Sequence, residues 1–403
     1  MTRRPRLIGR RMLLRSASGL VASIAAARHA LGAPPAAARA PGRSMTPLSE
    51  RAPTEHPART RHEQLVGIST TPLGELDGTI TPSDLHFTRH HAGIPSVDPQ
   101  RFELLIHGLV QRATVFKLDE LRRLPSRTVT CFVECAGNGL PAVRSPGRER
   151  TPGDIDGSTS NSEWTGVALR TVLDEVGVAP AARWLLAESE DAARYARSIP
   201  IEKALDDALL AYAQNGEPIR AEQGYPLRLL LPGWEGSTCV KWLRRIELGE
   251  RPWLTRDETA RFSGILRDGS VRLFDFELGP KSIITAPAYP RRIEVGWWEI
   301  RGLAWSGAGR IARVEVSVDG GAAWHAATLD EPVLPRAHAR FRFAWRWSGG
   351  PAVLLSRAVD ERGQVQPSWK EFSAARATGN DYHNNHVRGW RVEPDGRVFF
   401  ERG

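Results

Sequence analysis

The spacing of apolar residues changes near residue 280, and this change constrains the fold more than any other feature of the chain. Before it, apolar residues recur at both helical and strand spacings. After it, alternating stretches follow one another at intervals of roughly ten residues. We therefore expect an α+β domain over residues 63–279 and an all-β, immunoglobulin-like sandwich over residues 280–403.

Individual elements can be assigned within both parts. In the first part the sequence predicts strands over residues 102–109, 128–134, 184–187 and 227–231, and helices over residues 118–124, 167–176 and 200–213. In the second part it predicts strands over residues 292–303, 310–318, 340–347 and 352–359, and no long helix. Asp319-Gly320-Gly321 and Asp395-Gly396 are typical of hairpin turns.

The net charge of +9 belongs to the N-terminus rather than to the body of the chain. Residues 1–43 hold nine of the 55 basic residues and no acidic residue, which leaves 46 basic against 46 acidic residues beyond them. A neutral body removes the main argument for a nucleic-acid or membrane-surface binder. The chain also lacks an apolar run of about 18 residues, so we expect no membrane span.

The N-terminus has the pattern of an export signal. Arg10-Arg11 precede a short Ala-rich stretch, and small residues follow it. Paired arginines at this point indicate the twin-arginine route, so we predict a signal peptide over residues 1–42, a linker over residues 43–62 and a periplasmic protein. The alternative is an Arg-rich disordered tail.

Cysteine usage excludes several cofactors. The three cysteines cannot build a disulfide framework, and the sequence contains neither a CxxCH motif nor Cys/His zinc spacing. We therefore expect no haem attached to this chain and no structural zinc. Cys135 follows a β-rich run and precedes Ala136-Gly137-Asn138-Gly139, a turn that would expose a thiol. A lone cysteine is more often a buried apolar residue.

Several separated segments, in order, resemble the sulfite oxidase family of molybdenum enzymes over almost all of residues 65–400. They are Phe87-Thr88-Arg89-His90-His91, Glu134-Cys135-Ala136-Gly137-Asn138, Trp164-Thr165-Gly166-Val167, Gly224-Tyr225-Pro226-Leu227-Arg228, Val240-Lys241-Trp242-Leu243, Ala304-Trp305-Ser306-Gly307 and Val314-Glu315-Val316-Ser317. Three further stretches favour the branch formed by the molybdenum subunits of periplasmic sulfane dehydrogenases: residues 281–285, 356–360 and 363–367.

The resemblance implies a molybdenum cofactor and assigns roles to particular residues. It implies a sulfite-oxidase-type domain that binds molybdenum with molybdopterin, with Cys135 as the protein ligand of the metal. It implies cofactor binding by His91, Asp191, Gln223, Arg228, Cys239, Val240 and Lys241, and anion binding at the metal by Arg89 and Arg376. Without the resemblance, Asp191 and Lys241 would be interpreted as a surface ion pair, and Arg89 and Arg376 as solvated surface residues.

The sequence departs from the family pattern at four positions. Gly139 and Leu140 stand where the family carries arginines, Phe262 stands at the register of its active-site tyrosine, and Gln223 replaces a histidine. Gly139 and Gln223 fit the sulfane dehydrogenase branch, whereas Phe262 fits neither branch. These changes remove groups that would contact a small oxyanion.

The resemblance leaves three functions open. The first is a sulfane dehydrogenase subunit that oxidises sulfane sulfur on a sulfur-carrier protein by oxygen-atom transfer from water and passes electrons to a c-type cytochrome. The second is a free sulfite dehydrogenase. The third, from a different class, is a cofactor-free secreted binding protein. We also expect a homodimer, or a cytochrome docked on the sandwich, because Trp297, Trp298, Trp305 and Trp345 exceed the needs of one core.

Overall fold

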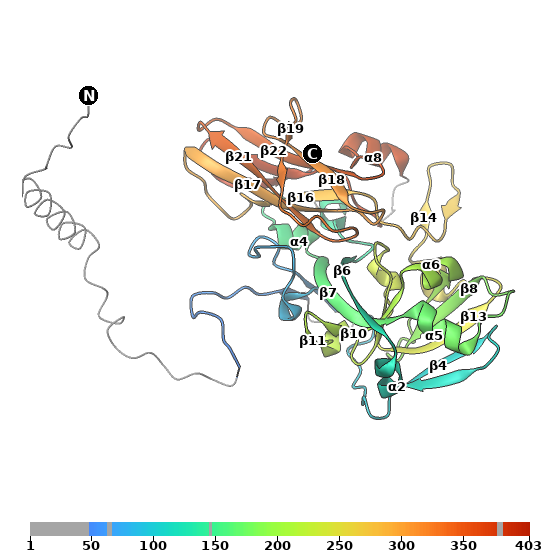
Figure 1. The fold of residues 1–403 in the computed structure, drawn as a ribbon. Coiled ribbons are helices and arrows are strands. Elements are labelled where there is room, and N and C mark those ends of the chain that lie inside the picture. The colour runs from blue at the N-terminus through green and yellow to red at the C-terminus, as the bar shows by residue number, and fades with distance from the viewer. Residues whose placement is uncertain (1–47, 63–66, 145–146, 377–381) are drawn as a thin grey trace, which may run out of the picture. The chain divides into compact units, whose positions relative to one another are not determined.

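The computed structural model describes residues 48–62, 67–144, 147–376 and 382–403. Residues 57–403 form one compact unit, and the described residues 48–56 are not part of it. The predicted signal peptide lies outside the described residues. Figure 1 shows the larger unit, in which blue-green to yellow elements make the first part and orange to red strands make the second.

The first part is built on two five-stranded sheets. One has the order β5-β4-β13-β8-β9, in which only the β4–β13 pair is parallel. Its strands are β4 (Glu103–Gly108), β5 (Thr114–Lys117), β8 (Trp184–Ser189), β9 (Ala196–Pro200) and β13 (Leu243–Gly249). The other has the order β11-β10-β7-β6, with β12 also paired to β10. Its strands are β6 (Ser126–Glu134), β7 (Thr159–Ala168), β10 (Leu209–Gln214), β11 (Glu217–Pro218) and β12 (Arg228–Leu230).

Smaller elements complete this part. They are the strands β1 (Thr60–His62), β2 (Ile68–Thr70) and β3 (Thr88–Arg89), the hairpin β14 (Gly264–Ile265) and β15 (Val271–Arg272), the helices α2 (Leu118–Arg123), α3 (Leu140–Arg144), α4 (Pro152–Asp156), α5 (Leu169–Val176), α6 (Ile201–Asp206) and α7 (Arg256–Ala260), and the 3₁₀ turns η2 (Ser83–Leu85), η3 (Ala221–Gln223) and η4 (Gly236–Thr238). Leu104, Ile106, Trp164, Val172 and Leu229 are buried in one core that joins both sheets.

The second part is a sandwich of two antiparallel sheets, as the period-two pattern predicts. One sheet has the order β16-β17-β21-β20 and the other β19-β18-β22-β23-β24. The strands are β16 (Lys281–Ala286), β17 (Gly296–Trp305), β18 (Ile311–Ser317), β19 (His325–Ala326), β20 (Thr328–Leu329), β21 (Ala339–Trp347), β22 (Ala352–Asp360), β23 (Gly389–Val392) and β24 (Val398–Glu401), with one short helix, α8 (Trp369–Ala375). Alternate residues of both sheets, such as Ile300, Val314 and Phe341, fill the core between them.

One predicted helix is wrong. The stretch 200–213 forms the short helix α6 and then the strand β10. Leu209 and Leu210 are both fully buried because β10 is an interior strand, paired on one side with β7 and on the other with β12. A strand buried on both faces has no alternation, and its apolar run reads like part of a helix. The other predicted helices and strands are present, with shifted ends.

The tryptophans of the sandwich are mostly core residues. Trp305 is fully buried, Trp345 is 8% exposed and Trp298 is half-buried, whereas Trp297 is 72% exposed. Only Trp297 of these four therefore offers a large apolar surface to a partner.

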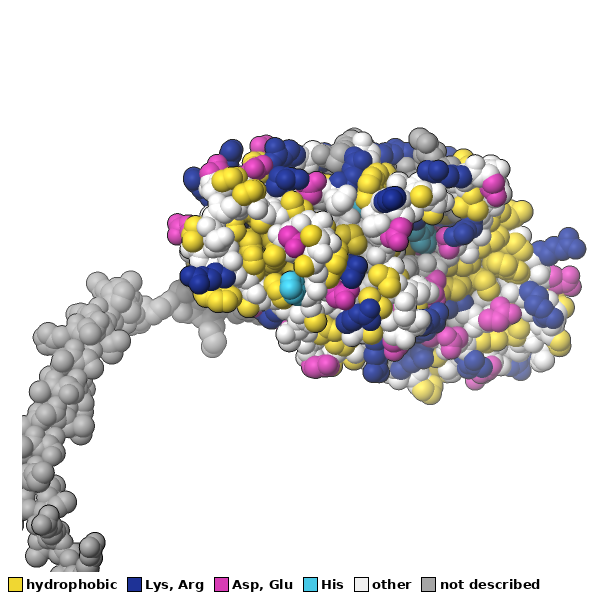
Figure 2. All heavy atoms as spheres, turned by 90° about the horizontal axis from the view of Figure 1, so that it is seen from above, with side chains coloured by type: hydrophobic (Ala, Val, Ile, Leu, Met, Phe, Trp, Pro, Cys, Tyr) yellow, Lys and Arg dark blue, Asp and Glu magenta, His cyan; other side chains and the backbone are white. Residues whose placement is uncertain are grey.

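The surface is of mixed charge. Basic and acidic side chains are interspersed over the face shown in Figure 2, in keeping with the neutral body of the sequence. Within the described residues, no helix is long and apolar enough to cross a membrane.

Candidate active site

A cavity of about 640 Å³ brings together nine of the ten residues that the sequence assigned to a site. They are Arg89, His91, Cys135, Asp191, Gln223, Arg228, Cys239, Val240 and Lys241. They come from segments up to 152 positions apart in the sequence. Some lie on β3 or directly after β3, β6 or β8, and the others lie in or next to η3, β12 and η4. Such a volume suits a cofactor or a drug-sized ligand, which fills roughly 300–1,000 Å³.

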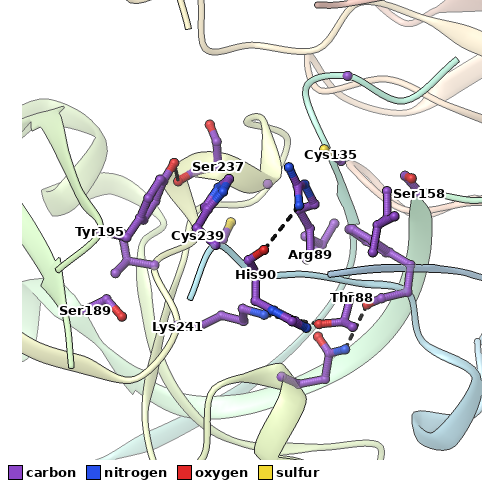
Figure 3. Close-up of a pocket in the computed structure, with 18 of the residues that line it drawn as sticks. Thr88, Arg89, His90, Cys135, Ser158, Ser189, Tyr195, Ser237, Cys239 and Lys241 are labelled. Carbon is purple, nitrogen blue, oxygen red and sulfur yellow. Dashed lines mark hydrogen bonds between the residues drawn. The ribbon is translucent and has the colours of Figure 1, made fainter. Parts of the chain in front are cut away.

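Cys135 lies at one end of the group, directly after β6, and Figure 3 shows it beside Arg89. Its amide N–H donates to the carbonyl of Ser158 at 2.9 Å, and its own carbonyl accepts from the N–H of Asn138 at 2.8 Å. These bonds fix the turn that presents the thiol. Burial raises the pKa of Cys135, while the N–H of Gly137 and the charge of Arg89 oppose that rise. The ligand-free protein therefore keeps the thiol protonated, and ligation of a metal would remove the proton.

Arg89 ends the short strand β3 next to this thiol. Its Nη1 donates to the carbonyls of Gly67 at 3.3 Å and of His90 at 3.2 Å. A guanidinium held in this way is a fixed cation with further N–H donors, which suits an oxyanion bound near Cys135.

Arg228 and Lys241 place two more cations in the wall of the cavity. Burial, and then the charge of Arg228, lower the pKa of Lys241 to about 7. Lys241 Nζ donates to the carbonyl of Glu222 at 2.8 Å and to Oγ1 of Thr88 at 3.2 Å; Figure 3 labels Lys241 and Thr88. Two buried cations close enough to repel each other favour an anionic ligand between or beside them.

Gln223 and Cys239 orient Arg228. The Nη1 of Arg228 donates to the backbone carbonyl of Gln223 at 3.1 Å and to its Oε1 at 3.4 Å, and Nη2 donates to the carbonyl of Cys239 at 3.3 Å. The Nε of Arg228 is buried and has no hydrogen-bond partner within the described residues. This buried donor is available to a ligand, because an unpaired buried N–H is costly otherwise.

His91 and Asp191 stand on the side of the cavity near Tyr195. Burial, and then the charge of Arg89, lower the pKa of His91 to about 4, so its imidazole is neutral. Arg261 Nη1 donates to Nδ1 of His91 at 2.9 Å, which leaves the proton of the ring on Nε2. The buried carboxylate of Asp191 accepts the N–H of Tyr195 at 3.1 Å.

Arg376 is the predicted site residue that the structure does not bring to the cavity wall. Its guanidinium donates to the backbone carbonyls of Tyr382 and His383 and packs over the ring of Phe372. Polar residues that line the cavity but were not expected from the sequence include Tyr195, Arg261 and Tyr382. Of these three residues, only Arg261 had a signal in the sequence, because it precedes Phe262, which stands at the register of the family's active-site tyrosine.

The positions at which the sequence departs from the family pattern lie at the cavity or its border. Leu140 and Phe262 line it. Gly139 has φ +83°, and a Cβ there would lie 2.8 Å from a guanidinium nitrogen of Arg388. A side chain at position 139 would therefore be strained by this φ and would displace the guanidinium of a buried arginine from the C-terminal domain. The ring of Phe262 lies 4.5 Å from the guanidinium carbon of Arg197 and 5.3 Å from the ring of Tyr382.

A buried ion cluster stands behind the thiol. Glu134, the residue before Cys135, accepts hydrogen bonds from Asn138 Nδ2 at 2.8 Å, Lys281 Nζ at 2.9 Å and Trp305 Nε1 at 2.6 Å. Asp156 lies 3.0 Å from Lys281 and 3.1 Å from Arg388. All four charged side chains are at most 5% exposed. The C-terminal domain thus supplies the counter-charges for the loop that carries the thiol.

Comparison with known proteins agrees with this architecture. The model of the oxidoreductase molybdopterin binding domain matches residues 91–256, and that of the Mo-co oxidoreductase dimerisation domain matches residues 273–389. Mitochondrial sulfite oxidase of Mus musculus is 30% identical over 385 residues, which cover 86% of this chain and 70% of that protein. Nitrate reductase (NADH) 2 of Phaseolus vulgaris is 33% identical over 348 residues, but the chain spans only 38% of its length.

A solved structure extends the likeness to three dimensions. The crystal structure of the sulfane dehydrogenase SoxCD from Paracoccus pantotrophus contains a chain that is 39% identical, with a TM-score of 0.87, over 90% of this chain and 96% of that one. The protein is therefore a molybdopterin oxidoreductase built from a cofactor domain and a dimerisation domain. It belongs to the sulfite oxidase family.

The residues present fit the cofactor of this family. A molybdopterin carries a phosphate, and the cavity offers the buried cations of Arg228 and Lys241 and an unpaired Arg228 Nε. At the other end it offers the thiol of Cys135 near Arg89, whereas the second lining thiol, Cys239, accepts the N–H of Leu231 at 3.3 Å. In the described ranges, no group of three or more His, Cys, Asp or Glu side chains could hold a metal ion by itself. A metal here would need ligands from a cofactor in addition to the thiolate.

Proposed function

We propose that this protein is the molybdenum subunit of a periplasmic sulfane dehydrogenase. One observation carries the proposal: a single cavity holds the thiol of Cys135 beside the cation of Arg89, together with the buried cations Arg228 and Lys241. The first pair suits a metal and a sulfur oxyanion, and the second suits the phosphate of a pterin.

The chain's own residues would hold the cofactor at both ends. Cys135 would ligate the molybdenum, Arg228 and Lys241 would bind the phosphate, and Asp191 and His91 would contact the pterin edge. When bound, the cofactor supplies two-electron oxidation of sulfur coupled to the uptake of an oxygen atom from water. Arg89 then binds the negative charge of the substrate and stabilises its change during the reaction.

The end of the cavity near Cys135 favours, as substrate, sulfane sulfur carried by another protein. Leu140 and Phe262 are apolar where a small dianion would need a cation and a donor. Losing a charged and a neutral hydrogen bond costs about 2–4.5 kcal/mol if the two add. A carrier-bound substrate draws binding energy from the carrier's own surface and depends less on these contacts. The similarity to a solved sulfane dehydrogenase supports this reading.

Partners and location follow from the same proposal. Electrons would pass to a separate c-type cytochrome, because the chain lacks a CxxCH motif of its own. The twin-arginine leader would export the folded, loaded protein to the periplasm. The match to a dimerisation domain supports a homodimer through the C-terminal sandwich.

The proposal is tested by metal analysis and turnover. We expect about one molybdenum per chain, and Cys135→Ser should abolish turnover and the thiolate-to-metal absorption. Cys131→Ser is the matched control, because that thiol is buried on β6, outside the cavity wall. Metal-free protein from cells that make the cofactor, or full turnover by Cys135→Ser, would contradict the assignment and favour a cofactor-free binding protein.

A second function, oxidation of free sulfite, is supported by Arg89 at the thiol end and by the sulfite oxidases among the relatives. Steady-state turnover of sulfite against carrier-bound sulfane separates the two. Half-saturation by sulfite at low micromolar concentration, without any carrier, would favour this second function.

A further inference from the structure

The hairpin formed by β14 and β15 carries an exposed apolar face. Ile265 and Val271 stand opposite each other across the two strands, so their side chains share one face of the hairpin. Ile265 is 50% exposed and Val271 is 56% exposed. Leu273, two residues further along the chain, is 36% exposed. These three residues form the hairpin patch, and large apolar side chains exposed as a group mark interaction sites more often than single ones do.

The hairpin is anchored to the C-terminal domain. The N–H of Leu266 donates to the carbonyl of Ser270 at 2.9 Å, which closes the turn between the strands. Arg267, in this turn, donates from Nη2 to the carbonyl of Ser373 at 3.0 Å and from Nε to that of Arg376 at 3.3 Å. Figure 1 shows the hairpin beside α8, the helix that contains Ser373. A two-stranded hairpin alone is marginal in water, so these bonds hold the patch in place.

The hairpin also lies next to the wall of the cavity. Phe262 lines the cavity, and Ile265 follows it by three residues, a stretch that spans at most roughly 10 Å. The ring of Phe262 packs against that of Tyr382, another lining residue, at 5.3 Å. Arg376, whose carbonyl accepts from the hairpin, donates in turn to the carbonyl of Tyr382. A protein seated on the hairpin patch would therefore lie beside the cavity.

The two strands of the hairpin lie outside both domains that the family shares. The match to the molybdopterin binding domain ends at residue 256, and the match to the dimerisation domain begins at residue 273. β14 and β15 occupy the interval between these ranges. The shared domains therefore do not account for this apolar face, and the match to a dimerisation domain does not make a second copy its occupant.

The size of the hairpin patch indicates a partner that binds and leaves. A permanent subunit interface buries roughly 2,000 Å² or more, whereas transient encounters bury less than about 1,200 Å². Three side chains on a short hairpin fit the smaller class. A carrier that delivers one sulfur and departs needs such a small interface. It must also place its sulfur in the cavity, so part of its surface has to lie beside the cavity wall, which is not required of an electron acceptor.

We propose that the hairpin patch is the docking surface for the sulfur-carrier protein while its sulfane enters the cavity. The inference rests on the proposed function and names the surface that binds the carrier of its substrate. Apolar side chains of the carrier cover Ile265, Val271 and Leu273 in the complex. Removing this apolar contact changes the binding of the carrier without changing the chemistry at Cys135.

The first experiment removes the apolar groups and keeps the hairpin. The double variant Ile265→Ser, Val271→Ser in the molybdenum-loaded protein should raise KM for carrier-bound sulfane about tenfold or more and leave kcat within about twofold. Its kcat/KM for free sulfite should also stay within about twofold, because sulfite needs no carrier. Val115→Ser on β5, at 47% exposure, is the matched control and should keep wild-type kinetics with both substrates.

The second experiment locates the carrier on the wild-type protein. Amide hydrogen exchange of residues 264–272 should slow when the carrier protein, loaded with a persulfide on its cysteine, is added. Free sulfite alone should not slow it. Exchange in β5 should be the same with and without the carrier. This measurement depends neither on turnover nor on a variant.

Three results would overturn the inference. One is a KM of the double variant for carrier-bound sulfane within about twofold of wild type, and another is unchanged exchange of residues 264–272 when the carrier is bound. The third is a loss that appears only in reduction of the cytochrome or in the mass by light scattering, which would assign the patch to the cytochrome or to a second copy. Failure of the proposed function has a different signature and removes both proposals: wild-type protein would then neither bind nor turn over the loaded carrier.

Discussion

Lys281 Nζ lies 2.9 Å from Oε1 of Glu134, so the first strand of the C-terminal sandwich neutralises the residue next to the proposed molybdenum ligand. Lys281 is 2% exposed and also pairs with Asp156 at 3.0 Å. The thiol of Cys135 therefore depends on a cation from the other domain. The dimerisation domain therefore supplies charges that support the active site.

Removing this cation should destabilise the protein strongly. Lys281→Met leaves two buried carboxylates with one fewer counter-charge, and breaking a buried ion pair in this way costs about 3–5 kcal/mol. Urea unfolding measures the loss. Lys370→Met makes the same change on an exposed residue of α8 and should stay within about 0.5 kcal/mol of wild type. Equal stability of both variants would contradict the role given to Lys281.

The cofactor-free protein should become more stable as pH rises from about 7 to 10.5. Burial lowers the pKa of Lys241 from its ordinary 10.5 to about 7. Below pH 7 the amine is protonated in both states and the cost of burying the charge is fully present. Between the two values only the unfolded chain holds the proton, so the free energy of unfolding increases with pH.

Comparison of variants isolates this contribution. Lys241→Met should exceed wild type in stability near neutral pH, and the difference should shrink toward about pH 10. After loading with the anionic cofactor, the free energy of unfolding of the two proteins should change with pH in the same way, because a nearby negative charge keeps Lys241 protonated. Parallel pH profiles of the two cofactor-free proteins would show that Lys241 keeps its ordinary pKa.

Substrate choice should change with the apolar residues at the cavity. Leu140→Arg would add a cation to the wall and should raise kcat/KM for sulfite about tenfold or more, and adding Phe262→Tyr should raise it further by a smaller factor. The same substitutions should not raise kcat/KM for carrier-bound sulfane. Leu254→Arg, on an exposed leucine, is the control. Position 139 is left as glycine, since a side chain there would be strained by its φ of +83° and would displace Arg388.

Export should require the paired arginines of the leader. Replacing Arg10 and Arg11 by lysine should leave the precursor in the cytoplasm, because the twin-arginine route reads that pair. Cell fractionation and the mass of the protein measure the outcome. Replacing Arg3 and Arg4 by lysine keeps the same charge and should allow normal export. Periplasmic protein of mature size from the first variant would refute this route.

The sequence predicted the parts of the structure that local pattern determines. The alternating stretches after residue 280 became a sandwich, and the run before Cys135 became β6. The resemblance to the family assigned roles to nine residues that line one cavity, six of them within the quoted segments. The interior strand β10 was missed because burial on both faces removes the alternation that marks a strand.

Contacts across long sequence separations were not predictable. Arg376 was expected at the substrate, yet its guanidinium binds the carbonyls of Tyr382 and His383. Neither the approach of Arg388 to Gly139 nor the pairing of Lys281 with Glu134 has any local signal. A single buried lysine or tyrosine shows no periodicity, so only the tertiary fold reveals its partner.

The ion cluster behind the thiol also sets an order of events during synthesis. Glu134 and Asp156 leave the ribosome long before Lys281 and Arg388, the cations that neutralise them. A nascent chain that ends before residue 280 would have to bury two carboxylates without compensation, which disfavours its compaction. The pocket for the metal should therefore mature only after translation is complete, so that cofactor insertion acts on full-length chains and incomplete ones stay empty.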